Sequence, residues 1–176
     1  MHSEHDLALD SEYELDKDTG TKWISDTNVF EDALKYSGDV VIQADPGTGK
    51  SYAALKQLGA PEHPFIFVAD TIASAEDLGS EHDLPVYYKD QPAPPDMDFI
   101  TIPHHAHKDR FVDSDIHLVV DEWHSLLADY DFKETVIDNL VQSFSEFKQI
   151  IGLTGTYLPV PHPHKHVKVS RNRDDI

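Results

Sequence analysis

Residues Ala44 to Ser51 read Ala-Asp-Pro-Gly-Thr-Gly-Lys-Ser and place two glycines, a lysine and a hydroxyl in one short segment. Glycines let the backbone curl so that successive N–H groups point at an anion. The lysine adds a positive charge at the start of the following helix, and the Ser51 hydroxyl can ligate Mg²⁺. The segment matches the phosphate-binding pattern with Ala44 in place of its first glycine. We therefore expect a nucleotide's phosphates to bind to Pro46, Gly47, Thr48, Gly49, Lys50 and Ser51.

A second group of candidate catalytic residues follows an apolar run, in the segment Leu118-Val119-Val120-Asp121-Glu122-Trp123-His124. At the end of a buried strand, Asp121 can bind Mg²⁺ opposite Ser51. Glu122 can polarise the water that attacks a terminal phosphate. With Lys50, these two carboxylates form the predicted catalytic set. Taken alone, an apolar run ending in Asp-Glu is also a common way to end a strand at solvent.

A third segment, Ile151-Gly152-Leu153-Thr154-Gly155-Thr156, is again an apolar run leading into small hydroxylated residues. Thr154 and Thr156 could hydrogen-bond the acidic pair or His124 and so sense the γ-phosphate. The alternative is an ordinary turn at a strand end, because Ser, Thr and Gly favour such turns.

The elements that position these segments follow from short continuous apolar runs, which are typical of strands buried on both faces. Helical stretches separate the runs, so the sequence predicts an α/β fold with a mostly parallel sheet covered on both faces. The expected strands are 40–42, 65–69, 99–102, 116–120 and 150–153, with 85–88 as a weaker edge candidate. The expected helices are 25–36, 51–58, 73–79 and 134–147.

Composition restricts the remaining possibilities. The chain has 176 residues, with 33 Asp and Glu against 14 Lys and Arg, which gives a net charge of −19. Such acidity argues against a generic nucleic-acid binder or a binder of anionic membranes. The absence of cysteine excludes disulfides and thiolate sites, and no run is long enough to span a membrane. An acidic N-terminus is the wrong sign for a targeting segment, so we expect a cytoplasmic protein.

We expect one main domain over residues 21–158. The acidic residues 1–20 predict a disordered tail, because such composition buries little apolar surface. Residues 159–176 predict an extended, basic segment rich in Pro and His, with a possible edge strand at 167–169. Two histidine clusters, at 104–107 and 162–166, are interpreted as surface loops, with zinc binding as the alternative.

In order and spacing, these motifs resemble the first RecA-like domain of a superfamily-two helicase of the DExH type. The DExH box is Asp121-Glu122-Trp123-His124, and Leu153-Thr154-Gly155-Thr156 resembles the family's Ser/Thr-Ala/Gly-Thr motif. The resemblance implies a P-loop NTPase fold, a three-layer sandwich, with ATP and Mg²⁺ as cofactors. It also implies that His124, Thr154 and Thr156 couple hydrolysis to domain movement, and that Thr71 and Thr101 lie at strand ends that touch the nucleic-acid backbone.

The sequence departs from the family in three ways. Asp70 replaces a proline at a predicted nucleic-acid contact, no glutamine precedes Gln43, and the family's second RecA-like domain with its arginine finger is not found in the chain. We therefore expect weak or no hydrolysis by the chain alone, and a partner that supplies a second domain. Binding of single-stranded or duplex nucleic acid should be weak and salt-sensitive.

Two other functions fit the same motifs. One is a non-motor, ATP-dependent interaction switch in a replication or defence complex. The other is the ATPase of a DNA-packaging motor, which shares the phosphate loop, the Asp-Glu pair and a similar third motif. His124 directly after Asp121-Glu122-Trp123 favours the DExH interpretation over the packaging enzyme.

Overall fold

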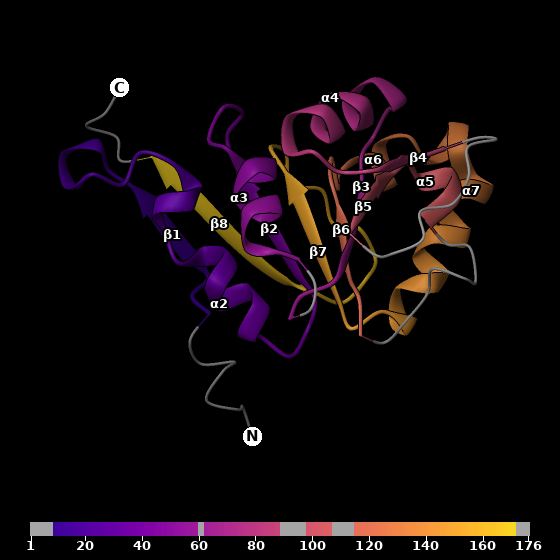
Figure 1. Cartoon of the computed structure of the whole chain (residues 1–176). Coiled ribbons are helices and arrows are strands. Elements are labelled where there is room, and N and C mark those ends of the chain that lie inside the picture. The colour runs from indigo at the N-terminus through magenta and orange to yellow at the C-terminus, as the bar shows by residue number, and fades with distance from the viewer. Residues whose placement is uncertain (1–8, 60–61, 89–97, 107–114, 172–176) are drawn as a thin grey trace.

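The computed structural model describes residues 9–59, 62–88, 98–106 and 115–171. Within these residues one eight-stranded sheet has the order β1-β8-β2-β7-β6-β3-β5-β4 (Figure 1). Each paired strand is parallel to its neighbour, as the alternation of apolar runs and helices predicts. The strands are β1 Glu12–Leu15, β2 Val40–Ala44, β3 Phe65–Val68, β4 Val86–Tyr87, β5 Phe99–Thr101, β6 His117–Val120, β7 Gln149–Thr154 and β8 Lys165–Arg171.

Helices cover the sheet on both faces and give the fold three layers (Figure 1). One face packs against α2 Val29–Lys35, α3 Lys50–Gln57 and α4 Ile72–His82. The opposite face packs against α5 Pro103–Ala106, α6 Ser125–Ala128 and α7 Tyr130–Ser143. Short 3-10 turns are η1 Lys17–Thr19, η2 Ile24–Asp26 and η3 Phe144–Glu146.

The central strands explain the unbroken apolar runs. All residues of β3, β6 and β7 are buried, because helices cover both faces of the sheet and successive side chains point to opposite faces. In β6, for example, Val119 joins the core under α2 to α4, whereas Leu118 and Val120 join the core under α5 to α7.

The order of the strands brings the three predicted motifs to one edge of the sheet. All strands point the same way, so the segments that follow them lie at a common carboxyl edge. β7 lies between β2 and β6. The end of β7 at Thr154 and the turn that follows it, with Thr156, therefore lie between the phosphate loop after β2 and the Asp121–Glu122 pair after β6.

The two ends of the described chain differ from the sequence-based expectation. Part of the expected tail over residues 1–20 is ordered, because Glu12–Leu15 form β1 and pair with β8. Leu9 and Leu15 are buried in the core. The many acidic residues around them in the sequence led to the prediction of a disordered tail. Residues 1–8 lie outside the described part. β8 is longer than expected and is not an edge strand, because it lies between β1 and β2.

The helix expected over residues 134–147 begins earlier and ends earlier. α7 starts at Tyr130, is interrupted at Lys133 (φ −130°, ψ 29°), and ends at Ser143 before η3. The short helices α5 and α6 were not expected, because four residues are too few to show a helical period. α6 follows the Asp121–His124 turn directly and adds Leu126 to the core under α7.

Candidate nucleotide-binding site

The loop between β2 and α3 has the backbone of a phosphate cradle. Gly47 and Gly49 have φ of +78° and +81°, which is the left-handed region that favours glycine. A Cβ at Gly47 would meet no atom within 4 Å, so the loop faces open space there. The buried Thr48 fixes the loop from beneath: its hydroxyl donates to the Asp45 carbonyl at 2.7 Å, and its own carbonyl accepts from Ile24 N–H at 3.1 Å.

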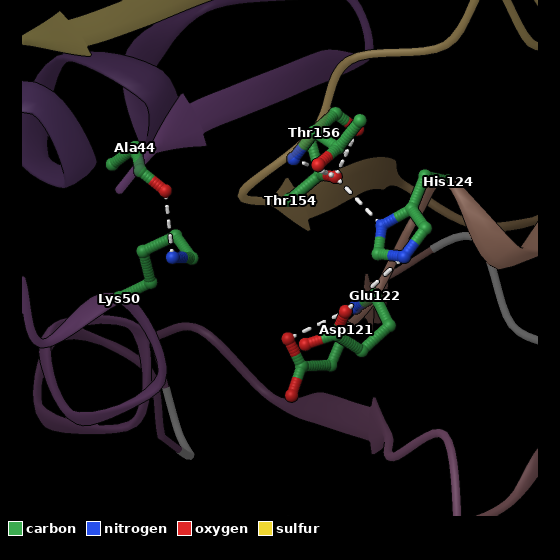
Figure 2. A network of polar contacts seen from close by, with 7 residues as sticks. All are labelled: Ala44, Lys50, Asp121, Glu122, His124, Thr154 and Thr156. Carbon is green, nitrogen blue, oxygen red and sulfur yellow. Dashed lines mark hydrogen bonds and ion pairs between the residues drawn. The ribbon is translucent and has the colours of Figure 1, made fainter. Parts of the chain in front are cut away.

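Lys50 begins α3 and folds back over this loop (Figure 2). Its Nζ donates to the carbonyls of Ala44 at 2.8 Å and Asp45 at 3.2 Å. Burial lowers the pKa of Lys50, and the carboxylates of Asp121, Glu122 and Asp45 partly offset that effect. The ammonium group is thus held at the loop, with acidic groups facing it from the end of β6.

Asp121 is the first residue after β6, and its backbone N–H donates to the Val68 carbonyl at 2.9 Å. Burial, followed by repulsion from Glu122, raises the pKa of Asp121 to about 6. A hydrogen bond of 3.0 Å from Glu122 N–H to Asp121 Oδ1 and the charge of Lys50 act in the opposite direction. A carboxylate that is costly to ionise in the free protein is one that a cation would stabilise strongly.

Glu122 has a φ of +51°, a conformation that is uncommon for a residue with a side chain. Strain of this kind persists only where the surroundings impose it, and it clusters at functional sites. The Glu122 carboxylate approaches His124, with 3.5 Å between Glu122 Oε2 and His124 Nε2, whereas the Asp121 carboxylate accepts from the Glu122 N–H. The two neighbouring carboxylates therefore make contacts with different groups of the site.

His124 joins the acidic turn to the end of β7 (Figure 2). Its Nδ1 lies 3.0 Å from Thr154 Oγ1. Thr154 Oγ1 donates to the Thr156 carbonyl at 2.6 Å and accepts from Thr156 N–H at 3.1 Å. The contact predicted between Thr154 and His124 is present, whereas Thr156 takes part through its backbone.

A cleft of about 510 Å³ contains most of the predicted site residues. This volume lies within the range of small-molecule sites. Thr48 and Thr154 are buried and do not line it. Tyr52 and three residues of α4 line it without having been predicted, because no local pattern reveals that α4 crosses near the loop. The lining residues are Pro46, Gly47, Gly49, Lys50, Ser51, Tyr52, Leu78, Glu81, His82, Asp121, Glu122, His124, Gly155 and Thr156.

The donor atoms of this cleft suit a hard cation bound with an anion. Ser51 and Asp121 both line the cleft, and hydroxyl and carboxylate oxygens are the kind of ligand that Mg²⁺ takes. The histidine clusters give no comparable site: among the described residues, no group of three or more His, Asp or Glu is arranged to hold a metal ion. His107 lies outside those residues.

The two threonines predicted to contact nucleic acid have different surroundings. Thr71 is exposed at the start of α4, where its hydroxyl accepts from Ser74 N–H at 3.1 Å. Thr101 is fully buried at the end of β5, and its hydroxyl donates to the Tyr87 carbonyl at 2.8 Å. A hydroxyl with no exposed surface cannot reach a phosphate, so Thr101 is withdrawn from the candidate contacts.

The parallel sheet, its strand order and its two helical layers define a RecA-like α/β fold. The fold is similar to the crystal structure of the Hef helicase domain from Pyrococcus furiosus, with a TM-score of 0.57 and 16% identity over 78% of this chain and 35% of that one. It is also similar to a DEAD box protein from the hyperthermophile Methanococcus jannaschii, with a TM-score of 0.55 and 13% identity over 82% of this chain and 47% of that one. The chain spans less than half the length of either structure.

Comparisons by sequence add no family. No family model matches the chain, and no curated protein matches it significantly. Among the helices that the structure describes, none has the length and apolar character needed to cross a membrane.

Proposed function

We propose that the chain is the ATP-binding module of a DExH-type nucleic-acid helicase or translocase, with ATP and Mg²⁺ as its cofactors. One observation carries the proposal: the segments that follow β2, β6 and β7 place Lys50, Asp121 and Glu122 around a single cleft. A lysine beside a left-handed glycine loop, facing two carboxylates across that cleft, is the arrangement that phosphoryl transfer requires.

Each residue has a role that its position allows. The loop N–H groups and Lys50 bind the phosphates, and Ser51 with Asp121 holds Mg²⁺. When bound, Mg²⁺ neutralises charge that develops on the phosphate oxygens. Glu122 orients and deprotonates the attacking water, and the His124–Thr154 contact links that carboxylate to the end of β7.

A second cavity beside the loop suits the nucleoside. It measures about 450 Å³ and shares Gly49, Tyr52 and Glu81 with the phosphate cleft. Trp23 and Tyr52 line it and are 44% and 46% exposed, which is unusual for large aromatic side chains. We assign this cavity to the base, which would stack on an exposed ring.

Hydrolysis by this chain alone should be slow. None of the described residues that line the phosphate cleft is an arginine. Arg171 is the one arginine in the described part, and it ends β8. In the sheet, β2 and β7 separate β8 from β6, which leads to the acidic pair. An arginine supplied to the transferring phosphate contributes about 10³–10⁵-fold to the rate, so a partner domain that provides one should activate the site.

Nucleic acid should bind at the carboxyl edge near Thr71, and bind weakly. Asp70 lies at the same strand end and repels phosphate, and the chain carries a net charge of −19. Each cationic contact to a phosphate also weakens as salt rises, so binding that is already weak should fall further with added salt. A partner domain would then supply much of the affinity for the nucleic acid.

Binding calorimetry with Mg-ATP tests the phosphate site. Lys50→Ala should weaken binding at least about 30-fold, since removing one member of a buried charged contact costs about 2–5 kcal/mol. The matched control is Lys148→Ala, which makes the same charge change at an exposed residue just before β7. Equal affinity of the Lys50→Ala protein and wild type would overturn the proposal.

Hydrolysis assays with and without single-stranded DNA or RNA test the motor assignment. Stimulation by a nucleic acid, lost in Glu122→Gln with nucleotide binding retained, is the expected result. Binding without any stimulated hydrolysis, together with ATP-dependent capture of a protein partner, would replace the motor with an interaction switch. A full helicase rate from the chain alone would contradict the need for a partner.

A further inference from the structure

Trp123, the variable residue of the DExH segment, lies fully buried behind the acidic turn. Its ring occupies a slot that exists because residue 152 is glycine. A Cβ at Gly152 would lie 2.6 Å from Trp123 Cε3 and 2.7 Å from Cδ2, which is closer than real atoms approach. Strand β7 therefore contacts the indole through bare backbone, and any side chain at Gly152 would displace the ring.

The other sides of the ring are closed by aromatic and imidazole groups. Phe144 of η3 stacks on Trp123 with ring centroids 5.7 Å apart and planes 19° from parallel. His162 and His164 meet the indole edge-on at 6.3 Å and 5.7 Å. The two histidines belong to the chain between β7 and β8, which we call the return segment (residues 157–164).

The return segment is itself fixed to the fold. His162 Nε2 contacts Asp39 Oδ2 at 2.6 Å, just before β2. Tyr157 contacts His164 Nε2 through its hydroxyl at 2.8 Å and stacks on His166 of β8 with centroids 3.8 Å apart. The histidines that sequence analysis assigned to a surface loop therefore pack around Trp123.

Shape, and not hydrogen bonding, sets the position of the indole. Trp123 Nε1 is buried and has no hydrogen-bond partner in the part of the chain that the structure describes. Its backbone N–H donates to the Leu153 carbonyl at 2.9 Å, which ties the acidic turn to β7. In the sequence, Glu122 with its left-handed backbone directly precedes Trp123, and His124 directly follows it.

We propose that Trp123 is a positioning residue: its packing between Gly152 and the return segment holds Glu122 and His124 in the geometry needed for hydrolysis. The inference rests on the proposed function of the same site. A turn with a strained residue needs an anchor, and a rigid ring held on several sides supplies one. The return segment, through His162 and His164, would thereby influence Glu122 without touching it.

Steady-state hydrolysis of saturating Mg-ATP by Gly152→Ala and Trp123→Leu tests this role. Both should lower kcat by about 100-fold, the usual cost of a displaced catalytic group, with unchanged Mg-ATP affinity. The conservative Trp123→Phe should keep most activity. In the Glu122→Gln background neither substitution should lower the rate further, because Trp123 acts through Glu122. Gly152→Ala combined with Trp123→Leu should be no slower than the slower single variant, because both substitutions disturb the same contact.

A second readout does not depend on turnover. The chain has two tryptophans, so the spectrum of Trp23→Phe identifies the Trp123 indole resonance in the ¹H–¹⁵N spectrum of the protein that retains Trp23. That resonance should shift when Mg-ADP binds, and Gly152→Ala should abolish the shift without loss of affinity. An unchanged resonance in a nucleotide-saturated protein, or equal kcat in folded Gly152→Ala and wild type, would overturn the proposal. Loss of binding in Lys50→Ala alone supports the nucleotide site independently.

Discussion

His124 Nδ1 lies 3.0 Å from Oγ1 of Thr154, and that hydroxyl already donates its hydrogen to the Thr156 carbonyl at 2.6 Å. Thr154 can therefore only accept from His124, so Nδ1 must carry the hydrogen. The contact leaves His124 Nε2 directed at Glu122 Oε2, 3.5 Å away. One threonine thus determines which imidazole nitrogen faces the Glu122 carboxylate.

Replacing Thr154 should separate hydrolysis from nucleotide binding. Thr154→Val keeps the volume but removes the acceptor, so His124 loses its fixed tautomer. We expect hydrolysis to fall by about 10²-fold, in the range for disturbed general-base chemistry, with little change in Mg-ATP affinity. Thr154→Ser keeps the hydroxyl and should stay close to wild type in the same rate assay. Equal rates for the Val and Ser variants would contradict the role of the contact.

Substitution of Glu122 should stabilise the folded protein while it inactivates the site. Glu122→Asn places a residue that tolerates the left-handed region at φ +51° and removes a charge beside Asp121. We expect a gain of about 1 kcal/mol in the free energy of unfolding, measured by urea denaturation. The same substitution at the exposed Glu146, which does not have a positive φ, is the control. A loss of stability specific to residue 122 would argue against backbone strain.

Asp121 should make stability fall as pH rises. Its pKa is raised to about 6 from 3.8, so between these values the native state binds the proton that the unfolded state has released. The penalty is complete above pH 6 and amounts to up to about 3 kcal/mol. Asp121→Asn should therefore stabilise the nucleotide-free protein at pH 7 and give no gain at pH 4. The exposed Asp77→Asn is the matched control, and denaturation series at both pH values decide the matter.

His117, at the other end of β6, should have the opposite effect. It is buried, its Nδ1 contacts Gln149 Oε1 at 3.1 Å, and burial lowers its pKa to about 4. As pH falls from 6.5 toward 4, His117 binds a proton in the unfolded state but stays neutral in the native state. Up to about 3 kcal/mol of stability is therefore lost. His117→Gln should flatten the dependence of stability on pH in this window. His104→Gln, at an exposed histidine, should leave the slope unchanged.

The cavity lined by Trp23 and Tyr52 should bind the base of a nucleotide and make no contact with a ligand that consists of phosphates alone. Trp23→Ala removes the exposed ring beside Gly49 and should weaken Mg-ATP binding by about 10-fold, in line with the value of one stacked base. Binding of Mg-triphosphate, which has no base, should not change. Calorimetry with both ligands measures the difference. An equal loss for the two ligands would place the base elsewhere.

The strands and the motif positions could be predicted from sequence because both depend on local composition. The apolar runs ending at Val120 and Leu153 had to be strands covered on both faces, and a parallel sheet brings their ends together. Other features depend on contacts that no local pattern contains. The approach of α4 to the loop and the burial of Thr101 arise from packing between distant segments.

The ends of the described chain were mispredicted for a specific physical reason. Charge outweighed periodicity in the interpretation of residues 9–15, although Leu9, Tyr13 and Leu15 all pack on the core. In the same way His162 and His164 were assigned to solvent, because the ring that they cover, Trp123, is some 40 residues away in the sequence.

The place of β8 between β1 and β2 has a consequence for how the protein is made. β1 leaves the ribosome first of all the described strands, yet its partner is the last of them to be synthesised. At translation rates of roughly 5–20 residues per second, Glu12–Leu15 wait about 8–30 s for residues 165–171. An unpaired apolar strand would risk aggregation during that interval, and Glu12 and Glu14 protect against it. The acidic segment is thus suited to a strand that must stay soluble before it can pair.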